Sequence, residues 1–478
     1  MKLWRVAGVL VLIGAEALIY GYSYPFFSLA LEKRELASWL IGLNASLAGA
    51  GILIVGPALP WLIARIGVRL LVAGLFAVSL ASFAAIVAVD HLVVWFAARF
   101  VMGACFAAMW TATEIWLNGV VDDRHRGRII GASGTLYATC QFFGPLILGG
   151  VGVTGSLPLI VAMVPLAVGV VVALSIRSAT GEAEEEENLG DTKSLKLALT
   201  LAGALVAAAF LAGIGETAMQ ALLPLYGLAH GLDDAGAAYL VAVFSLGEAV
   251  LVAGLGWMAD RYGRRFTLLV CAGTATVAAA LIPLAVVSPL TLWPVLFVGG
   301  GTIAGIYTLG VVLIGTDFRG HRLAVVSTGF AMAYAAGSIV GSTPVGYLID
   351  LFGAEALPLS IAASFLGLTV FLLRKPASER RPAIADLPEI EFDLSSLVAA
   401  QRGEPGYEPW VSLLDESKFV HVEEAEVADL HMRNHDQWKE RHLEKWFRER
   451  AAEIARRAAQ REERGAYVLE RVEAHQPG

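Results

Sequence analysis

The chain has 478 residues, of which 57% are hydrophobic and only 16% are charged, and its mean hydropathy is +0.66. Soluble domains carry about 25% charged residues, so this composition excludes a soluble enzyme, a nucleic-acid-binding protein and a disordered chain. The formal charge of −8 is confined to one region. Residues 1–381 hold 22 basic and 22 acidic side chains, whereas residues 382–478 hold 13 and 21. The sequence therefore predicts a membrane body followed by an acidic tail.

Apolar stretches recur along the first four-fifths of the chain, and a helix that crosses a bilayer needs about 20 such residues. The first stretch is too long for the core of a signal peptide, so we expect it to be retained as a span. The three cysteines all fall in apolar stretches and suggest no disulfide framework. The twelve predicted spans are 6–31, 38–63, 69–89, 92–120, 128–152, 156–177, 195–229, 236–258, 266–288, 291–316, 322–348 and 356–373.

Basic residues are distributed unevenly between the two sets of span ends. Nineteen Lys and Arg residues fall at one set, and only Lys33 and Arg34 fall at the other. Loops rich in Lys and Arg stay on the cytoplasmic side of the membrane. We therefore expect an integral protein of the cytoplasmic (inner) membrane of a bacterium, with both termini in the cytoplasm.

The first half of the membrane body resembles the second. Gly67 recurs as Gly263, 196 residues on, and Gly144 recurs as Gly337. Two similar six-helix halves are typical of a transporter that binds its substrate between them. The expected fold is an all-α membrane protein, with twelve transmembrane helices in two pseudo-symmetric six-helix halves and a cytoplasmic C-terminal tail that contains a helix. The predicted parts are an N-terminal half (1–177), a cytoplasmic acidic linker (178–194), a C-terminal half (195–375), and a cytoplasmic linker and charged helical tail (376–478).

The most distinctive motif lies between the eighth and ninth predicted spans. Its glycines permit a tight turn, and its aspartate can cap a helix or pair with an arginine across the protein. Such a pair would hold one state of a rocking transporter. An ordinary turn with basic membrane anchors would explain the arginines but not the fixed spacing. The motif residues are Gly256, Asp260, Arg261, Gly263, Arg264 and Arg265.

This motif resembles the cytoplasmic loop of the major facilitator superfamily, although Ala64 replaces the acidic residue in the equivalent loop of the first half. Arg99 and Gly103 resemble the arginine motif of the family's fourth span, with Met102 at a position where Gln is usual. The stretch 98–150 is similar to the YcaD-like branch, and the resemblance covers about residues 1–375. It implies the superfamily fold and alternating access. The fifth span resembles the family's antiporter motif, with one extra residue, at Gly144, Pro145, Gly149 and Gly150.

Ionisable side chains inside the spans are the sharpest candidates for function. A charge in the middle of a bilayer costs about 2.5–3.5 kcal/mol, so such residues usually face a cavity or a partner. A mid-membrane Glu that binds and releases a proton is what a proton-coupled carrier needs. The alternative is a hydrogen-bonded Glu, or for the arginine a charge pair, that only joins helices. The candidates for a proton and substrate cavity are Glu16, Arg99, Glu114, Glu216 and Glu248.

Four glutamates against one arginine favour neutral or cationic compounds over multiply charged anions. Several aromatic residues are candidates for the cavity wall, although most membrane aromatics serve packing or the interface. They are Trp110, Trp116, Tyr137, Phe142, Tyr226, Tyr307 and Tyr334.

We therefore expect a secondary active transporter that moves a small molecule by alternating access, coupled to protons, with export of an amphiphilic compound favoured over uptake of a metabolite. No nucleotide-binding loop, nucleophile with a base, or metal-ligand pattern stands out, so no enzyme activity, cofactor or metal is expected. The expected partners are the substrate, protons and lipid, and not nucleic acid. A second hypothesis is a non-transporting sensor or scaffold that acts through its cytoplasmic tail, which could bind a protein partner.

Overall fold

The computed structural model describes residues 3–55, 58–121, 125–176, 192–318 and 320–374. The predicted tail (376–478) and nearly all of the predicted linker (178–194) lie outside these residues. The described ranges contain thirteen helices and no strand, which confirms the all-α class. The first seven are α1 (Leu3–Glu32), α2 (Ser38–Val55), α3 (Leu59–Ile66), α4 (Val68–Ala88), α5 (Leu92–Val120), α6 (Arg126–Val151) and α7 (Leu157–Ser175). The others are α8 (Thr192–Ala229), α9 (Asp234–Tyr262), α10 (Arg264–Ala285), α11 (Pro289–Asp317), α12 (Gly320–Phe352) and α13 (Ala356–Arg374).

A helix lies at each of the twelve predicted spans. Ten helices in the described part of the chain are long and apolar enough to cross a membrane, and α2 and α6 occupy the other two positions. Within lipid, every backbone amide and carbonyl must be bonded inside the protein. Continuous helices satisfy this requirement locally, which is why hydropathy alone located them.

Two predicted spans differ in detail from the observed helices. The single span predicted over 38–63 is divided into α2 and the short α3. Helix α2 ends at Val55, directly before Gly56-Pro57 in the sequence, and Pro60 lies in the first turn of α3. Proline has no amide hydrogen to donate, so it favours the start of a helix over its interior. Helix α8 bends at Ala202, whose φ of −141° and ψ of 38° are not helical.

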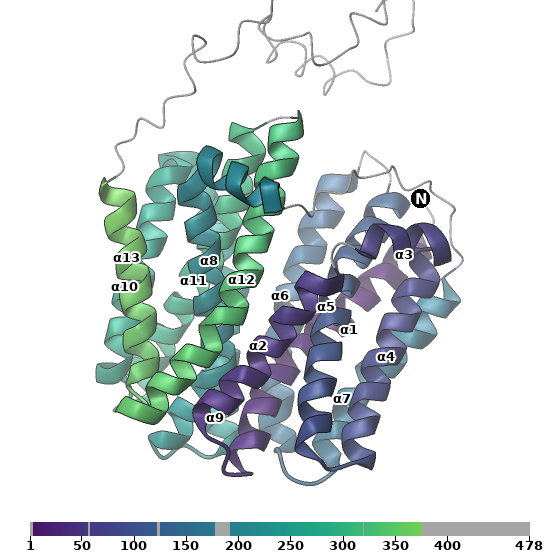
Figure 1. The fold of residues 1–478 in the computed structure, drawn as a ribbon, viewed down its shortest axis with the longest axis horizontal. Helices are drawn as coiled ribbons and strands as arrows, with labels where there is room; N and C mark the ends of the chain where they lie inside the picture. Colours follow the sequence, from purple (N-terminus) through teal and green to yellow (C-terminus); the bar gives the residue numbers. More distant parts are fainter. Residues whose placement is uncertain (1–2, 56–57, 122–124, 177–191, 319, 375–478) are drawn as a thin grey trace, which may run out of the picture. The chain divides into compact units, whose positions relative to one another are not determined.

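The described helices form two groups (Figure 1). In the first, α1 packs on α5, α6 and α7, and α4 packs on α5 and α7. In the second, α8 packs on α12, α9 on α11, and α10 on α11 and α13. The groups meet where α2 packs on α12, α6 on α9, and α1 on α8. We call them the first half (α1–α7) and the second half (α8–α13).

Both halves contain the same kind of close helix crossing. Gly21 of α1 lies against the backbone of α6, and Gly144 of α6 lies against the backbone of α1. In the second half, Gly213 of α8 lies against α12, and Gly337 of α12 lies against α8. A Cβ atom at any of these positions would collide with main-chain atoms of the opposite helix. Small residues let membrane helices approach this closely.

Two equivalent turns also require glycine. Gly67 joins α3 to α4 with φ 77° and ψ 148°, and Gly263 joins α9 to α10 with φ 94° and ψ 139°. This region of backbone conformation is accessible essentially only to glycine. The repeat seen in the sequence thus reflects the same backbone turn in each half.

Candidate functional site

The described helices alternate in direction, so their turns gather at two ends of the bundle. We call the end with the α1–α2, α8–α9 and α12–α13 turns the Lys33 end. The end with the Gly263 turn and the start of α1 is called the Arg261 end.

A carboxyl group of α8 is hydrogen-bonded to a hydroxyl group and an amide group of the second half. The Tyr334 hydroxyl of α12 donates to Glu216 Oε2 at 2.8 Å, and Gln220 Nε2 lies 3.4 Å from Glu216 Oε1. The Glu248 carboxyl group on α9 lies within electrostatic range of Glu216. The structure thus places two of the predicted glutamates, Glu216 and Glu248, near each other.

One hydrogen bond of this cluster joins the two halves. Gln141 Nε2 of α6 donates to Glu248 Oε2 of α9 at 3.0 Å, and both side chains are buried. Glu248 Oε1 has no hydrogen-bond partner among the described residues. Because α6 and α9 belong to different halves, this bond must change when the halves move apart.

Glu16 of α1 is only 1% exposed, and neither carboxyl oxygen has a hydrogen-bond partner among the described residues. It lies within electrostatic range of Tyr137 of α6, which is also within range of Glu216 and Glu248. A buried ionised carboxylate without a partner is costly. These surroundings therefore suit a neutral, protonated Glu16 side chain better than an ionised one.

Arg99 of α5 is 1% exposed and forms no ion pair with a described residue. Its Nη1 donates to the Ser23 hydroxyl at 2.9 Å, and its guanidinium lies 4.1 Å from the ring centroid of Tyr24 and 5.1 Å from that of Phe27. Nε and Nη2 have no hydrogen-bond partner among the described residues. The cation is therefore held by aromatic faces and one hydroxyl.

Glu114 of α5 is exposed and lies nearer the Arg261 end than Arg99. It is within electrostatic range of Tyr307 of α11, in the second half. One turn before it, the Trp110 ring packs edge-on against Tyr137, with ring centroids 4.5 Å apart and planes at 77°. Glu114 thus lies one turn after the Trp110–Tyr137 ring pair.

At the Lys33 end, a carboxylate of the second half caps a helix of the first. Asp350 accepts hydrogen bonds from the backbone amides of Ser38 at 2.8 Å and Trp39 at 2.9 Å. The first amides of a helix have no partner within it, and a carboxylate there also meets the positive end of the helix dipole. Deeper between α2 and α12, the hydroxyls of Ser46 and Thr343 are 2.8 Å apart.

Charged pairs add to this end. Lys33 Nζ lies 2.9 Å from Asp234 Oδ2, which joins the α1–α2 turn to the start of α9. Arg34 pairs with Asp90 and covers the Trp95 ring at 4.4 Å. The hydrogen bond from Arg34 holds the pKa of the Asp90 carboxyl below its ordinary value.

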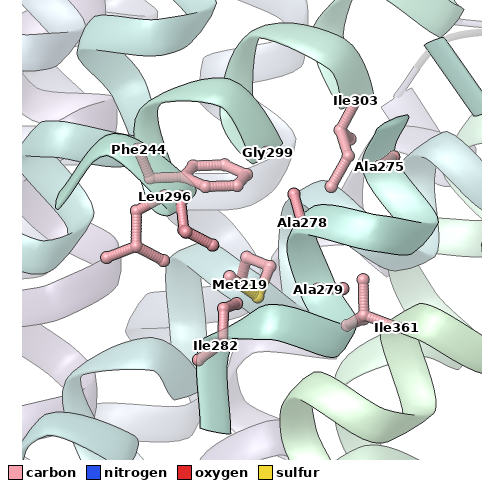
Figure 2. Close-up of a pocket in the computed structure, with 11 residues that line it drawn as sticks. Met219, Phe244, Ala275, Ala278, Ala279, Ile282, Leu296, Gly299, Ile303 and Ile361 are labelled. Carbon is pink, nitrogen blue, oxygen red and sulfur yellow. The ribbon is translucent and has the colours of Figure 1, made fainter. Parts of the chain in front are cut away.

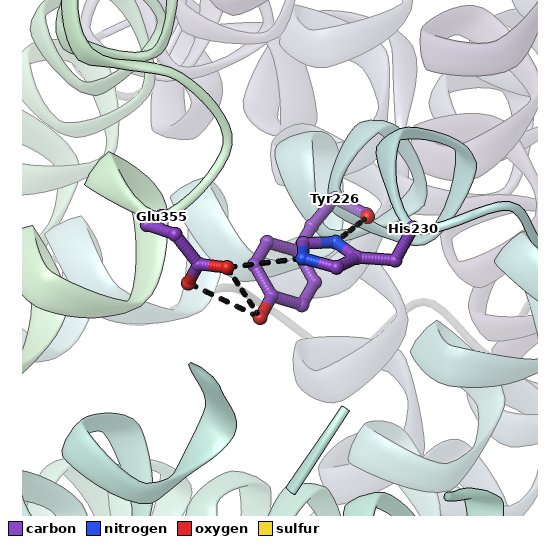
Figure 3. A network of polar contacts seen from close by, with 3 residues as sticks. All are labelled: Tyr226, His230 and Glu355. Carbon is purple, nitrogen blue, oxygen red and sulfur yellow. Dashed lines mark hydrogen bonds and ion pairs between the residues drawn. The ribbon is translucent and has the colours of Figure 1, made fainter. Parts of the chain in front are cut away.

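A further network at the Lys33 end lies inside the second half (Figure 3). His230 Nε2 lies 3.0 Å from Glu355 Oε1, and the Tyr226 hydroxyl lies 3.3 Å from Glu355 Oε2. His230 Nδ1 lies 2.8 Å from the Tyr226 carbonyl. The network ties the end of α8 to the start of α13. Tyr226, a predicted cavity aromatic, therefore lies away from the central carboxyl groups.

The predicted motif of the fifth span lies on α6, where its glycines have different surroundings. Gly144 packs on the α1 backbone, and a Cβ on Gly149 would collide with the Tyr239 ring of α9. Gly150 has no such neighbour within 4 Å, and Pro145 lies inside the helix. Gly144 and Gly149 thus permit the close approach of α6 to its neighbours.

The predicted gating motif lies at the Arg261 end. Asp260 is exposed and forms no ion pair with a side chain that the structure describes. A cavity of about 190 Å³ between α9 and α11 is lined by Gly256 and Asp260. The α6 and α9 surfaces at this end are open, since an added Cβ would have no neighbour within 4 Å at Gly131, Gly134, Gly254 or Gly256. Arg261 and Arg264, which begins α10, flank the Gly263 turn together with Arg265.

A second cavity, of about 10 Å³, lies inside the second half (Figure 2). Its lining is apolar and includes Met219, Phe244 and Ile361. Its volume corresponds to about one water molecule, so it is a packing void.

Several residues of this arrangement were not singled out from the sequence. Gln141 and Gln220 carried a usable signal, because an amide side chain within an apolar span needs a partner. Asp350, Asp234 and Glu355 lie at helix ends, where acidic residues are common, so their partners became visible only in three dimensions.

A family model described as Major Facilitator Superfamily matches residues 7–341. YfkF of Bacillus subtilis (strain 168), an uncharacterized MFS-type transporter, is 23% identical over 379 residues, which cover 77% of this chain and 95% of the relative. YcaD of Escherichia coli (strain K12 / DH10B), also an uncharacterized MFS-type transporter, is 24% identical over 360 residues, covering 74% of this chain and 91% of the relative.

Two solved structures share the fold. The nucleoside transporter NupG aligns with a TM-score of 0.68 at 12% identity, covering 78% of this chain and 98% of that one. A D-xylose-proton symporter aligns with a TM-score of 0.61 at 12% identity, covering 77% and 98%. The family match extends over more than half of the sequence and agrees with the helical bundle. The chain therefore belongs to the Major Facilitator Superfamily.

Proposed function

We propose that this protein is a proton-coupled secondary transporter that exports an amphiphilic neutral or cationic compound across the bacterial inner membrane. The observation that supports the proposal most directly is the pair of neighbouring carboxyl groups on Glu216 and Glu248, the second of which accepts a hydrogen bond from Gln141 of the other half. A site of this kind can hold one proton and release it when its surroundings change.

The Gln141–Glu248 hydrogen bond supplies a route for coupling. An ionised carboxylate accepts a stronger hydrogen bond from an amide than a protonated carboxyl group does. The charge on Glu248 therefore alters the strength of a contact between α6 and α9. Protonation at this position would weaken the link between the halves and favour their rearrangement.

The proposed direction of transport is supported by the distribution of basic residues together with the contacts between the halves. The Arg261 end carries most of them, so we assign it to the cytoplasm. The contacts between α2 and α12 and between α1–α2 and α9 join the halves at the Lys33 end. In this state the site would receive a compound from the cytoplasmic side, as an exporter requires. A structural neighbour named as a proton symporter is consistent with proton use by this fold.

Proteoliposomes loaded with ethidium test the proposal. Release driven by an imposed pH gradient, and its loss when a protonophore collapses the gradient, are the expected results. Glu216→Gln should lower gradient-driven release by about 10-fold or more, while Glu35→Gln, at an exposed turn, should behave as the unaltered protein. Flux that ignores the gradient would exclude proton coupling, and normal flux with Glu216→Gln would leave that residue a structural role.

A further inference from the structure

An aromatic residue and a carboxylate are exposed on one face of α5, in the interior of a span. Trp110 is 41% exposed, and Glu114, four residues later, is also exposed. Residues four apart lie on the same side of a helix. The two side chains therefore present a ring and a carboxylate to the same space.

That space is the region between the halves. Trp110 packs on Tyr137, and Tyr137 lies one turn before Gln141 on α6, whose side chain bonds to Glu248 of the other half. Glu114 is within electrostatic range of Tyr307 on α11. Helices α5 and α11 do not pack extensively on each other within the described residues. Glu114 and Tyr307 therefore lie on helices of opposite halves that do not pack closely on each other.

The Glu114 carboxylate has no hydrogen bond or ion pair with a described side chain. The nearby Asn118 Nδ2 donates instead to the Glu114 backbone carbonyl, at 3.0 Å. A carboxylate without a cation, beside the edge-to-face Trp110–Tyr137 pair, attracts a positive charge. Aromatic faces add cation–π attraction and apolar contact for the body of such a molecule.

We propose that Trp110, Glu114 and Tyr137 form the recognition site for an organic cation with an aromatic body, such as a quaternary ammonium or phosphonium compound. The inference rests on the proposed transport function and names its substrate class. It separates two roles: Glu114 holds the cation, whereas Glu216 and Glu248 hold the proton.

Equilibrium binding to the purified full-length protein tests this site without transport. Tetraphenylphosphonium is the probe, and tetraphenylborate is its anionic isostere. We expect the cation to bind at least about 10-fold more tightly than the anion. Trp110→Ala and Glu114→Gln should each weaken binding of the cation by about 10-fold, and Trp110→Phe by less than about 3-fold, because phenylalanine keeps an aromatic face.

Matched controls are available elsewhere in the chain. Trp293→Ala removes a tryptophan that is 47% exposed on α11, and Glu35→Gln removes a carboxylate from a turn; both should bind the cation normally. If Trp110→Ala fails to fold in a thermal unfolding assay, the isosteric Glu114→Gln carries the test. Equal binding of the two isosteres, or unchanged binding by both Trp110→Ala and Glu114→Gln, overturns the site.

The outcome is separable from that of the proposed function. If ethidium release follows the pH gradient but binding is insensitive to Trp110 and Glu114, the recognition site is wrong and proton-coupled export stands. If binding depends on both residues but release ignores the gradient, the site stands and proton coupling is wrong.

Discussion

The Asp350 carboxylate on α12 accepts a hydrogen bond from the Ser38 backbone amide at 2.8 Å and thereby caps α2, a helix of the opposite half. Gly346, one turn earlier on α12, packs against the Ser38 backbone. Helix caps are usually supplied by a neighbouring residue in the chain. Here the cap comes from 312 residues away, so separation of the halves leaves the first turn of α2 uncapped.

Loss of this cap should open the Lys33 end. Because an N-cap contributes about 1 kcal/mol, Asp350→Ala should increase access to the end by about 5-fold, and Asp350→Asn by less. The reporter is maleimide labelling of Ser342→Cys in a protein whose three native cysteines are replaced, because Ser342 is fully buried on α12 and its backbone lies against Gly42 of α2.

Asp90→Asn is the matched control, since Asp90 lies at the same end but pairs within the first half. It should leave the labelling rate unchanged. Equal labelling of Asp350→Ala and the unaltered protein would show that the cap does not hold the halves together.

Charge substitution in the Lys33–Asp234 pair should change the labelling rate less than loss of the Asp350 cap does. A second substitution that restores opposite charges should reverse this change. The side chains are 42% and 28% exposed, so the pair contributes about 0–1 kcal/mol. Lys33→Glu places two like charges together and should raise the labelling of Ser342→Cys by about 2- to 3-fold at low salt. The double variant Lys33→Glu/Asp234→Lys should restore the original rate. Failure of the double variant to recover would assign the effect to the turn rather than to the pair.

The Gln141–Glu248 bond should matter for coupling. Gln141→Leu removes the donor and leaves the buried Glu248 carboxyl with one fewer partner, which costs about 1–3 kcal/mol. We expect gradient-driven ethidium release to fall about 10-fold, with no comparable loss in Gln141→Glu when external pH is low enough to protonate one carboxyl. Release is compared in proteoliposomes at matched protein content. Normal release by Gln141→Leu would contradict the coupling role.

Adjacent glycines on α6 provide a direct test of the packing. Gly149→Ala should collide with the Tyr239 ring of α9 and cost about 1 kcal/mol, which lowers the unfolding temperature by about 2 °C. Gly150→Ala meets no neighbour within 4 Å and should be neutral or slightly stabilising, since alanine favours helix. Thermal unfolding in detergent makes the comparison. Adding Tyr239→Ala to Gly149→Ala should recover stability; an unchanged deficit would point to another cause.

Much of the fold was predictable because helices in lipid satisfy their backbone groups locally. The twelve span positions and the paired turns at Gly67 and Gly263 followed from hydropathy and from the repeat in the sequence. The division of the span 38–63 was missed, although Gly56-Pro57 and Pro60 indicated it. A count of apolar residues measures how long a span is, but not whether its backbone hydrogen bonds run without interruption. For this reason it did not detect the break at these prolines.

The candidate site was predictable only as a set of residue types. The sequence by itself determined that Glu16, Arg99, Glu216 and Glu248 lie within apolar spans, because a charged residue in such a stretch is visible from composition alone. Only the tertiary structure decided that Glu248 meets Gln141 while Arg99 meets aromatic rings, since these contacts depend on the rotation and crossing of helices far apart in the chain. It also decided which end of the bundle is held together, because the Asp350 cap depends on where the other half places the start of α2.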